Sequence, residues 1–504
     1  MLRKSLFAVF AITSAAIALA QAPTSQLTVA LANDPKSLFL PRAADRSASN
    51  AAWSLYNGLV WTNEDGDIVP ALATKWDVSS DGKTYTFTLR QGVSFHNGEV
   101  FDSESVVATW ETGSDKSNDY ADNYKRVKEV KALDKYTVRM TLEAPDALFL
   151  STLAGSWAMV PAKYIRQVGL DKFDAAPVGT GPFKFESRSA GDRIVMSANP
   201  KYWEKGLPKV GKLTYRVIPD QTTRLAAVQT GEIDIANRLN ADLVKPLEKN
   251  AKVKVVSYPN DRVYYVAFKN IGAGKGTPLE NAQVRQAINY AINRPGIVKS
   301  IFSGQANLVS GFLVQGNLGY DSSMKPFAYD PERAKQLLKA AGFEKGFPIS
   351  MGCPTDAYTN INEVCLSVQR DLDKVGIDVS LEFKTSNSYW SKAQYEAVGA
   401  MYVDSWSSTV GEALPRLTGS LIPGAFYNTW NDPELVKQIN QIQITVDRKA
   451  RGEQYKKLQK YMFENPPFVY LYQPVIFEAV NSKLAGYSPR SAEEYFLKSV
   501  SVNK

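Results

Sequence analysis

INEVCLSVQRDLDKVGIDVSLEF (residues 361–383) contains the pattern that decides the fold class. Its first part predicts a helix, and Gly376 predicts the point where that helix has ended. After the glycine, Ile377, Val379 and Leu381 alternate with polar residues, as in a strand. A helix that leads through a glycine into a strand is typical of an α/β protein. We therefore expect an α/β fold.

Alternating apolar and polar residues predict further strands in the first third of the chain. In three runs the apolar residues occupy every second position, at Leu27, Val29 and Leu31, at Tyr85, Phe87 and Leu89, and at Val138, Met140 and Leu142. The second and third runs keep one polar face each. They are therefore expected to be antiparallel strands of a small mixed domain.

The second half of the chain is richer in helical patterns. One apolar stripe at helical spacing is formed by Val284, Ala287, Ile288, Ala291 and Ile292. Another helix is predicted to begin after Asp330 as N-cap, with Pro331 in its first turn, and to end at Gly342. The last strand-like run, residues 468–480, is expected to bring the chain back towards its first lobe.

The first 22 residues have the pattern of a secretory signal peptide. Arg3 and Lys4 are followed by an uncharged, mostly apolar run to Ala20, with small residues suited to cleavage up to Ala22. The alternative is a transmembrane helix, which needs about 20 apolar residues, whereas the polar chain begins at Gln21. No cysteine for a lipid anchor stands at the cleavage point. We expect an exported, soluble, periplasmic protein.

Length and charge restrict the remaining classes. A chain of 504 residues predicts two or three domains. The formal charge is +8, but the basic and acidic residues are interspersed and form no basic block. Such a distribution indicates a solvated surface and argues against nucleic acid as a partner.

The chain contains one histidine, which limits enzyme chemistry. His96 lies in GVSFHNGEVF (residues 92–101), where Asn97-Gly98 predicts a hairpin turn. A serine or cysteine hydrolase of the usual type would have to use this histidine as its base. The motifs G-x-S-x-G, H-E-x-x-H and G-x-x-x-x-G-K-[ST] are all absent from the sequence. We expect no enzyme, no cofactor and no metal site.

Cys353 and Cys365 are the two cysteines of the chain. Export would place them where disulfides persist, and a bridge would close a short loop and stabilise it by roughly 2–3 kcal/mol. The alternative is a pair of buried free thiols. A disulfide is the prediction favoured by the compartment.

Six stretches, in this order along the chain, resemble the extracytoplasmic solute-binding proteins of ABC transporters, family 5, the peptide and nickel class. They are WSLYNGLVWTNEDGDIVPALATKWDVSSDGKTYTFTLRQGVSFHNGEVFDSESVV (53–107), PVGTGPFKF (177–185), NPKYWEKGLPKVGKLTYRVIPDQTTRLAAVQTGEIDIA (199–236), NAQVRQAINYAINRPGIV (281–298), LDKVGIDVSLE (372–382) and the region of Trp406. The resemblance covers nearly the whole chain after residue 22.

The resemblance implies a two-lobed periplasmic-binding-protein fold of the cluster C type, with hinge crossover strands and an extra inserted domain. We expect domain I at residues 23–46, 177–270 and 472–504, domain II at 47–176, and domain III, the second lobe, at 271–471. Ligand would bind between the lobes, and the monomer would deliver it to a membrane ABC permease. GTGPF (179–183) combines flexible glycines with a rigid proline, which suits a crossing between lobes or a scaffold.

Two departures from the family bear on the ligand. Many peptide-binding relatives carry an aspartate three residues after the tryptophan that matches Trp406, whereas this chain has Thr409. Its run WSSTVGEA (406–413) instead resembles relatives that bind glutathione-like ligands. Near CPTDAYTN (353–360), the arginine of dipeptide-binding relatives is also missing. A modified peptide or another small polar solute is therefore expected rather than a simple dipeptide.

The resemblance and the residue chemistry together give a set of candidate ligand contacts. Trp406 offers a flat apolar wall, with a core aromatic as the alternative, and the neighbouring hydroxyls offer short donors and acceptors that also satisfy turns. Glu412 either pairs with a cationic group or caps the following helix. The candidates are Asp404, Ser405, Trp406, Ser407, Ser408, Thr409, Glu412, Arg416, Asp356 and Tyr358 in the second lobe, and Asn33 and Ser37 in the first.

Two other functions stay open at this point. The first is a binding protein of the same fold for a metal chelate or haem. The second is an exported hydrolase, which would need a carboxylate pair or the single histidine.

Overall fold

The computed structural model describes residues 25–42, 46–63, 66–355, 358, 360–385, 398–408, 411–425 and 427–503. The expected signal peptide and the candidates Asp356 and Thr409 lie outside these residues. Within them, no helix combines the length and the apolar character needed to cross a membrane.

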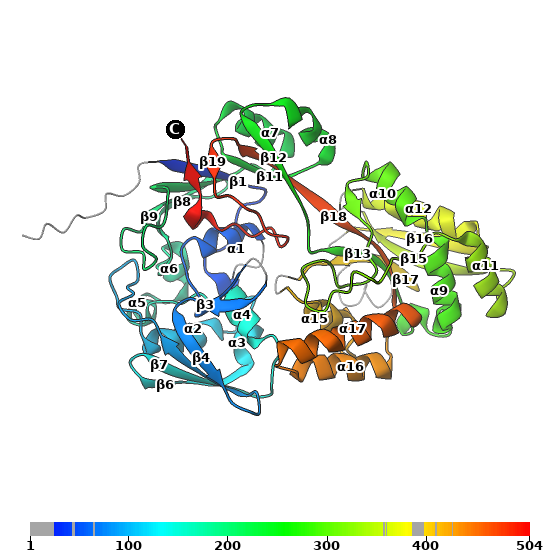
Figure 1. The fold of residues 1–504 in the computed structure, drawn as a ribbon, viewed down its shortest axis with the longest axis horizontal. Helices are drawn as coiled ribbons and strands as arrows, with labels where there is room; N and C mark the ends of the chain where they lie inside the picture. Colours follow the sequence, from blue (N-terminus) through cyan, green and yellow to red (C-terminus); the bar gives the residue numbers. More distant parts are fainter. Residues whose placement is uncertain are drawn as a thin grey trace, which may run out of the picture.

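The described chain forms two lobes that are joined by long strands (Figure 1). A continuous 12-stranded sheet runs through both lobes, in the order β16-β15-β17-β13-β18-β11-β1-β10-β9-β8, with β12 and β14 paired to β18. The predicted α/β, two-lobed fold is confirmed.

The first lobe is built on the part of this sheet that contains β1. Its strands are β1 (Gln26–Leu31), β8 (Phe183–Ser189), β9 (Arg193–Ala198), β10 (Lys212–Val217), β11 (Ile235–Leu239), β12 (Val253–Pro259), β19 (Leu484–Ala485) and β20 (Ser501–Val502). Its helices are α1 (Arg46–Trp53), α7 (Gln221–Thr230) and α8 (Ala241–Val244). β1 pairs in parallel with both β10 and β11.

A smaller unit is inserted into the first lobe after α1. Its strands are β2 (Val60–Thr62), β3 (Ile68–Pro70), β4 (Ala73–Val78), β5 (Thr84–Leu89), β6 (Val127–Asp134) and β7 (Thr137–Leu142). Its helices are α2 (Ser103–Gly113), α3 (Asp122–Lys125), α4 (Phe149–Ser156), α5 (Ala162–Val168) and α6 (Leu170–Ala175). β5 and β7 pair antiparallel, as their alternation predicts, and Tyr85, Phe87 and Leu89 all point into the core of this unit.

The second lobe carries the helices predicted in the second half of the chain. Its strands are β13 (Val263–Phe268), β14 (Ala306–Asn307), β15 (Phe347–Pro354), β16 (Ile377–Lys384) and β17 (Met401–Trp406). Its helices are α9 (Ala282–Ala291), α10 (Arg294–Ile301), α11 (Pro331–Ala340), α12 (Ile361–Asp373), α15 (Leu414–Leu421), α16 (Pro433–Ile444) and α17 (Arg448–Glu464).

Local signals in the sequence explain where several of these elements begin and end. The Asp330 carboxylate accepts a hydrogen bond of 2.8 Å from the Arg333 amide at the start of α11, as expected of an N-cap. Gly376 adopts a φ of 86° between α12 and β16, a conformation that other residues avoid. β15 and β16 are parallel neighbours, so residues 361–383 form the expected helix followed by a strand that returns to the sheet.

The described chain crosses between the lobes at two places. One is the short segment from Asn260 to Arg262, between β12 and β13. The other is β18 (Phe468–Asn481), whose first half pairs with β13 in the second lobe and whose second half pairs with β12 and β11 in the first. The two crossings are bonded to each other: Gln473 donates to the Asn260 carbonyl at 2.6 Å, and the Asn260 amide donates to the Pro474 carbonyl at 2.9 Å.

GTGPF does not form a crossing between the lobes. A Cβ at Gly179 would lie 2.0 Å from the Leu55 carbonyl oxygen, and one at Gly181 would lie 2.4 Å from the Leu55 carbonyl carbon. The glycines are thus needed for close backbone packing inside the first lobe, which is the scaffold role. The predicted domain limits stay a proposal; because β13 shares the core of the second lobe, we propose to place the first boundary near Arg262 rather than at 270.

A buried carboxylate lies on β18 beside the crossing. Glu478 is fully buried and accepts hydrogen bonds from Tyr258 at 2.9 Å, Tyr487 at 2.5 Å and Tyr495 at 3.3 Å. Burial raises the pKa of Glu478 to about 7, although the three hydroxyls act in the opposite direction. These bonds connect β18, β12 and the C-terminal segment.

The raised pKa predicts a pH-dependent contribution of Glu478 to stability. Between its ordinary pKa near 4.5 and about pH 7, the folded protein keeps the Glu478 proton and the unfolded chain has lost it. The contribution of Glu478 to the free energy of unfolding should therefore fall by about 3 kcal/mol in this window as pH rises. Glu478→Gln removes this contribution. Urea unfolding at pH 4.5–7.5 should therefore show that the free energy of unfolding of the variant, relative to that of the wild type, increases as pH rises. A constant difference between the two proteins would contradict the assignment.

Candidate functional site: a cleft between the lobes

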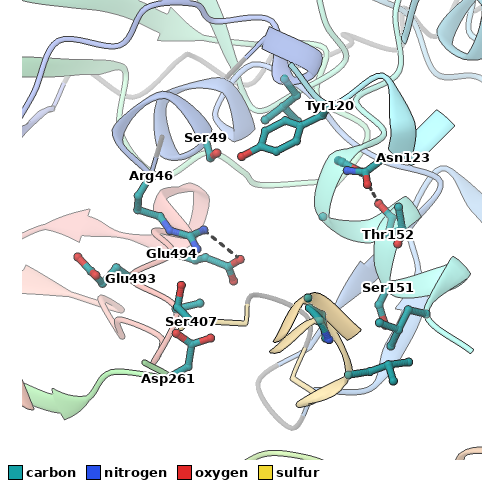
Figure 2. Close-up of a pocket in the computed structure, with 18 of the residues that line it drawn as sticks. Arg46, Ser49, Tyr120, Asn123, Ser151, Thr152, Asp261, Ser407, Glu493 and Glu494 are labelled. Atoms are coloured by element: carbon teal, nitrogen blue, oxygen red, sulfur yellow. Dashed lines mark hydrogen bonds and ion pairs between the residues drawn. The ribbon is translucent and has the colours of Figure 1, made fainter. Parts of the chain in front are cut away.

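A cavity of about 760 Å³ lies between the lobes and is lined by both of them and by the crossing segment. Its volume lies within the range of small-molecule sites. Figure 2 shows Arg46 and Glu494 facing each other at this cavity, with Ser49 and Tyr120 on one side and Ser407 and Asp261 on the other.

The first lobe supplies most of the charged groups of the cavity. Arg46 and Glu494 form an ion pair at 3.6 Å, and Arg126 pairs with Asp146 at 3.1 Å. Arg238 pairs with Glu493 by a direct hydrogen bond. Because every pair combines opposite charges, this wall offers both a donor for anions and an acceptor for cations.

The backbone positions Arg238 and Glu493 in an unusual way. Both are non-glycine residues in the left-handed region, with φ of 49° and 58°. Arg238 lies where the pairing register of β11 with β18 shifts, and Glu493 also accepts a 2.9 Å hydrogen bond from Asn260 in the crossing. Irregular strands and strained residues cluster at functional sites, where they direct side chains away from the regular lattice.

The crossing segment itself contributes one acidic and one basic side chain to the cavity. Arg262 donates to the Ser405 hydroxyl at 2.7 Å and lies at 3.4 Å from the Ser407 hydroxyl. Asp261 is buried and accepts a 2.7 Å hydrogen bond from the Ser408 amide. Burial raises the pKa of Asp261 to about 6, against the opposing effect of Arg416 at 3.7 Å.

The residues that the structure describes on the second-lobe side of the cavity carry no charge. They are Ser407, Leu414, Pro415, Thr418, Gly419 and Gln443. The charged groups of the described lining are Arg46, Arg126, Asp146, Arg238, Glu493 and Glu494 in the first lobe and Asp261 and Arg262 in the crossing. The cavity is therefore balanced in charge, and its charges lie on one side.

The lobes also touch at the rim of the cleft away from the crossing (Figure 1). The Ala147 amide donates to the Gln443 carbonyl at 2.8 Å, and Leu148 packs into the core of the second lobe. Arg448 at the start of α17 forms an ion pair with Asp67 of the inserted unit. The cavity is thus bounded by the crossing at one end and by these contacts at the other.

Of the candidate contacts, Ser407 and Asn33 line the cavity. Ser405 lies just behind them, because its hydroxyl accepts from Arg262. Asp404 and Tyr358 are bonded to each other at 2.9 Å, next to the Arg262 guanidinium. These candidates remain predictions as ligand contacts, and the structure places them in or next to the cleft.

Trp406 lies behind the neutral wall. Its indole contacts Tyr427 edge to face at 5.0 Å and packs closely against Gly419, where a Cβ would approach the ring to 2.2 Å. Gly419 itself faces the cavity. The packing of Trp406 thus corresponds to the alternative of a supporting aromatic that holds α15 in place.

Ser408, Glu412 and Arg416 are buried within the second lobe, where their side chains are occupied by protein partners. Glu412 receives two hydrogen bonds from Arg451, at 2.6 and 2.9 Å, and one from Tyr455 at 2.9 Å. Ser408 donates to the Glu412 carbonyl at 2.6 Å, and Arg416 donates to the Asn317 side chain at 3.1 Å. Their contacts give these side chains a structural role within the second lobe.

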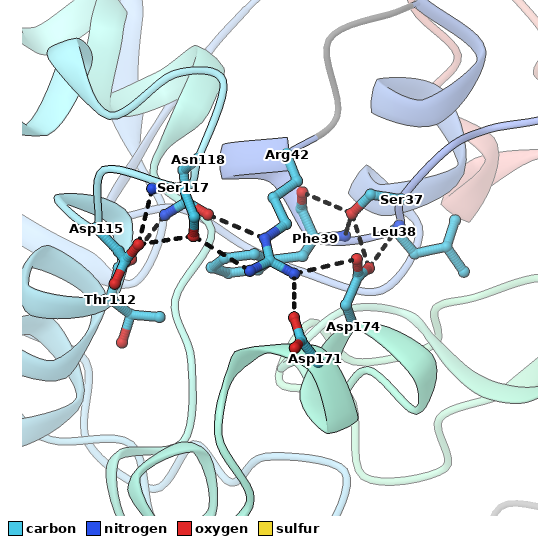
Figure 3. A network of polar contacts seen from close by, with 10 residues as sticks. All are labelled: Ser37, Leu38, Phe39, Arg42, Thr112, Asp115, Ser117, Asn118, Asp171 and Asp174. Carbon is cyan, nitrogen blue, oxygen red and sulfur yellow. Dashed lines mark hydrogen bonds and ion pairs between the residues drawn. The ribbon is translucent and has the colours of Figure 1, made fainter.

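Ser37 lies in a separate polar network of the first lobe (Figure 3). Its hydroxyl donates to Asp174 at 2.7 Å and accepts from the Phe39 amide at 2.9 Å. Arg42 joins the same network through Asp174 at 3.9 Å and also pairs with Asp171 at 2.8 Å. Ser37 is buried there and is not part of the cavity lining.

Cys353 and Cys365 form a disulfide that connects the end of β15 to α12, with their Cα atoms 6.5 Å apart. No group of three or more histidine, cysteine, aspartate or glutamate residues suited to a metal ion occurs in the described residues. His96 contacts the backbone of Gly179 and Gly181, and burial lowers its pKa to about 4. It lies in the first-lobe scaffold, as its turn context predicts.

The geometry defines a two-lobed binding protein with an interlobe site. Residues 67–428 match the model of "Bacterial extracellular solute-binding proteins, family 5 Middle". This match covers well over half of the chain, so the protein belongs to family 5 of the bacterial extracellular solute-binding proteins.

Similar proteins agree with this family. The chain is 30% identical over 462 residues to the glutathione-binding protein GsiB of Pectobacterium atrosepticum, covering 88% of each. HbpA2 from Haemophilus parasuis superposes with a TM-score of 0.86 at 24% identity, covering 95% of this chain and all of that one. DppA from Helicobacter pylori, in complex with the peptide STSA, gives 0.76 at 28% identity, covering 96% and 99%.

The buried pair of Glu412 and Arg451 generates a stability prediction. Glu412→Gln leaves the Arg451 guanidinium buried without its counter-charge, which typically costs about 3–5 kcal/mol of unfolding free energy. Urea unfolding should show this loss. Glu453→Gln is the matched control, because Glu453 forms an exposed pair with Lys456 and should change stability by less than about 1 kcal/mol. Equal effects of the two substitutions would contradict a structural role for Glu412.

Proposed function

We propose that this protein captures one peptide-like small solute in the cleft between its lobes and delivers it to an ABC importer. The observation that carries the proposal is the cavity itself, which combines two lobes, the crossing segment and charge-balanced walls. The names of GsiB and of DppA in complex with a peptide support a peptide-like ligand by similarity. A permease complex as partner, a monomeric state and a periplasmic location follow from the same proposal.

The proposed act is binding without chemical conversion. Four arginines and four carboxylates at the cavity can replace the water around a charged solute. The two crossings, bonded to each other at Asn260, would let the lobes move as rigid bodies about this point. The neutral wall of α15 would then cover the ligand and exclude water, which strengthens the charged contacts on the other side.

The proposal predicts that a small solute stabilises the folded protein. Native mass spectrometry should find one co-purified solute per chain, or thermal-shift screening of di- and tripeptides, glutathione, opines and sugars should find a stabilising one. A solute at 100 times its Kd would stabilise the folded state by about 2.7 kcal/mol. Scattering from the same sample should show closure of the lobes or a change in their arrangement. Absence of any bound solute in both experiments would contradict the proposal.

A substitution that fills the cavity tests the location of the site. Thr418 faces the cavity from α15, and its hydroxyl bonds to the Leu414 carbonyl at 2.9 Å. Thr418→Trp should abolish stabilisation by the solute, because the indole occupies the cleft. Thr230→Trp on α7 is the matched control, since Thr230 makes the same kind of bond to Ala226 at 3.2 Å outside the cavity. If the solute still stabilises the Thr418→Trp protein, the site lies elsewhere.

A further inference from the structure

Among the ion pairs of the cavity, Arg46 and Glu494 form an open pair, by which we mean that no direct hydrogen bond joins their charged groups. Their charged atoms are 3.6 Å apart, which is longer than the 2.7–2.9 Å or so of a direct charged hydrogen bond. The side chains are 21% and 22% exposed, and both line the cavity. In Figure 2 the two groups lie side by side and face its interior. Both therefore keep hydrogen-bonding capacity for a ligand.

The other charged groups of the cavity are directly hydrogen-bonded to protein partners. Arg126 donates to Asp146 at 3.1 Å, and Asp146 also accepts from the Leu148 amide at 2.9 Å. Arg238 and Glu493 are directly bonded, and Glu493 also accepts from Asn260. Arg262 is bonded to serine hydroxyls of the second lobe. Asp261 is buried beneath the Ser408 amide.

The loop that carries Glu494 is fixed from both sides. Arg490 stacks on the Phe496 ring at 3.8 Å, donates to the Thr62 carbonyl at 2.7 Å and lies 4.0 Å from Glu494. Glu493, the preceding residue, is held in the left-handed region by its bonds to Arg238 and Asn260. Glu494 is therefore presented at a defined place before any ligand arrives, which lowers the entropy lost on binding.

An open pair of opposite charges is complementary to a ligand group with both charges close together. An amino-acid head group has an ammonium and a carboxylate on the same carbon. In an ordinary dipeptide these two groups are on different residues, whose Cα atoms are about 3.8 Å apart across the peptide bond. A single Arg–Glu pair can thus bind both charges of the former but only one of the latter.

Resting on the proposed function, we propose that Arg46 and Glu494 form a subsite for an amino-acid head group. Arg46 binds the carboxylate, and Glu494 binds the ammonium group of the same carbon. The substrate class is a peptide-like solute with such a zwitterionic end, for example one linked through a side-chain carboxyl group. The second-lobe residues described at the cavity carry no charge and cover the remainder of the ligand, so the charged end is recognised by the first lobe.

Two isomeric probes separate this class from ordinary dipeptides. In γ-glutamylglycine the ammonium and one carboxylate share a carbon, whereas in α-glutamylglycine they do not, although composition and charge are equal. Isothermal titration of the full chain should show at least tenfold tighter binding of the γ-isomer. Acetylation of its amino group should remove this advantage.

Variants of the pair test the residues themselves. Arg46→Gln and Glu494→Gln should each weaken γ-glutamylglycine by about 10- to 100-fold and abolish the preference over the α-isomer, because one charged contact is lost. Arg42→Gln is the matched control: Arg42 is 20% exposed and paired with Asp171 in the same lobe, outside the cavity. A thermal unfolding curve for each variant checks that it is folded.

The outcomes are distinct. Equal or tighter binding of the α-isomer, or a γ-preference that survives both substitutions, overturns the head-group subsite. If neither isomer binds but another solute of the panel does, the subsite is again overturned while the proposed function stands. If no solute binds the wild type at all, the proposed function fails with it.

Discussion

The double crossing of the chain between the lobes is the constraint on which the rest of the structure depends. Asn260 bonds both to Gln473 and to Pro474, so the two connections form one mechanical unit. The same residue holds Glu493, and the next two residues, Asp261 and Arg262, reach the cavity. A ligand that changes these charged contacts therefore acts directly on the point about which the lobes can move.

The two lobes contribute different kinds of side chain to the cavity. Charge comes from the first lobe and the crossing, whereas the described wall of the second lobe consists of small, apolar and amide side chains. Arg416, a buried arginine of the second lobe, donates to Asn317 in that lobe and lies 3.7 Å from Asp261 in the crossing. Such an arrangement lets one lobe select a ligand by its charges, and lets the other enclose it and lower the local dielectric.

Much of the fold was predictable because its signals are local. The cap at Asp330, the glycine at 376 and the alternation in β5 each depend on a few neighbouring residues, and all appear where expected. The crossing at 260–262 was not found, because three polar residues between two strands look like any turn. GTGPF was open to two interpretations, since a glycine needed for close packing cannot be distinguished from a hinge without its partner, Leu55.

The site was harder to predict. The stretch from Asp404 to Ser407 lies in or next to the cleft. Arg46, Arg238 and Glu494 were not among the predicted contacts, since their ion pairs join residues hundreds of positions apart. Arg238 and its partner Glu493 are marked by a positive φ, and this feature is visible in three dimensions alone.

The central claim, that a small solute binds between the lobes, is tested most directly by hydrogen exchange of the protein with and without its stabilising solute. The account predicts simultaneous protection at 46–53 and 490–496 in the first lobe, at 259–263 in the crossing, and at 405–419 in the second lobe. Protection confined to one lobe, or found only away from the crossing, would contradict it.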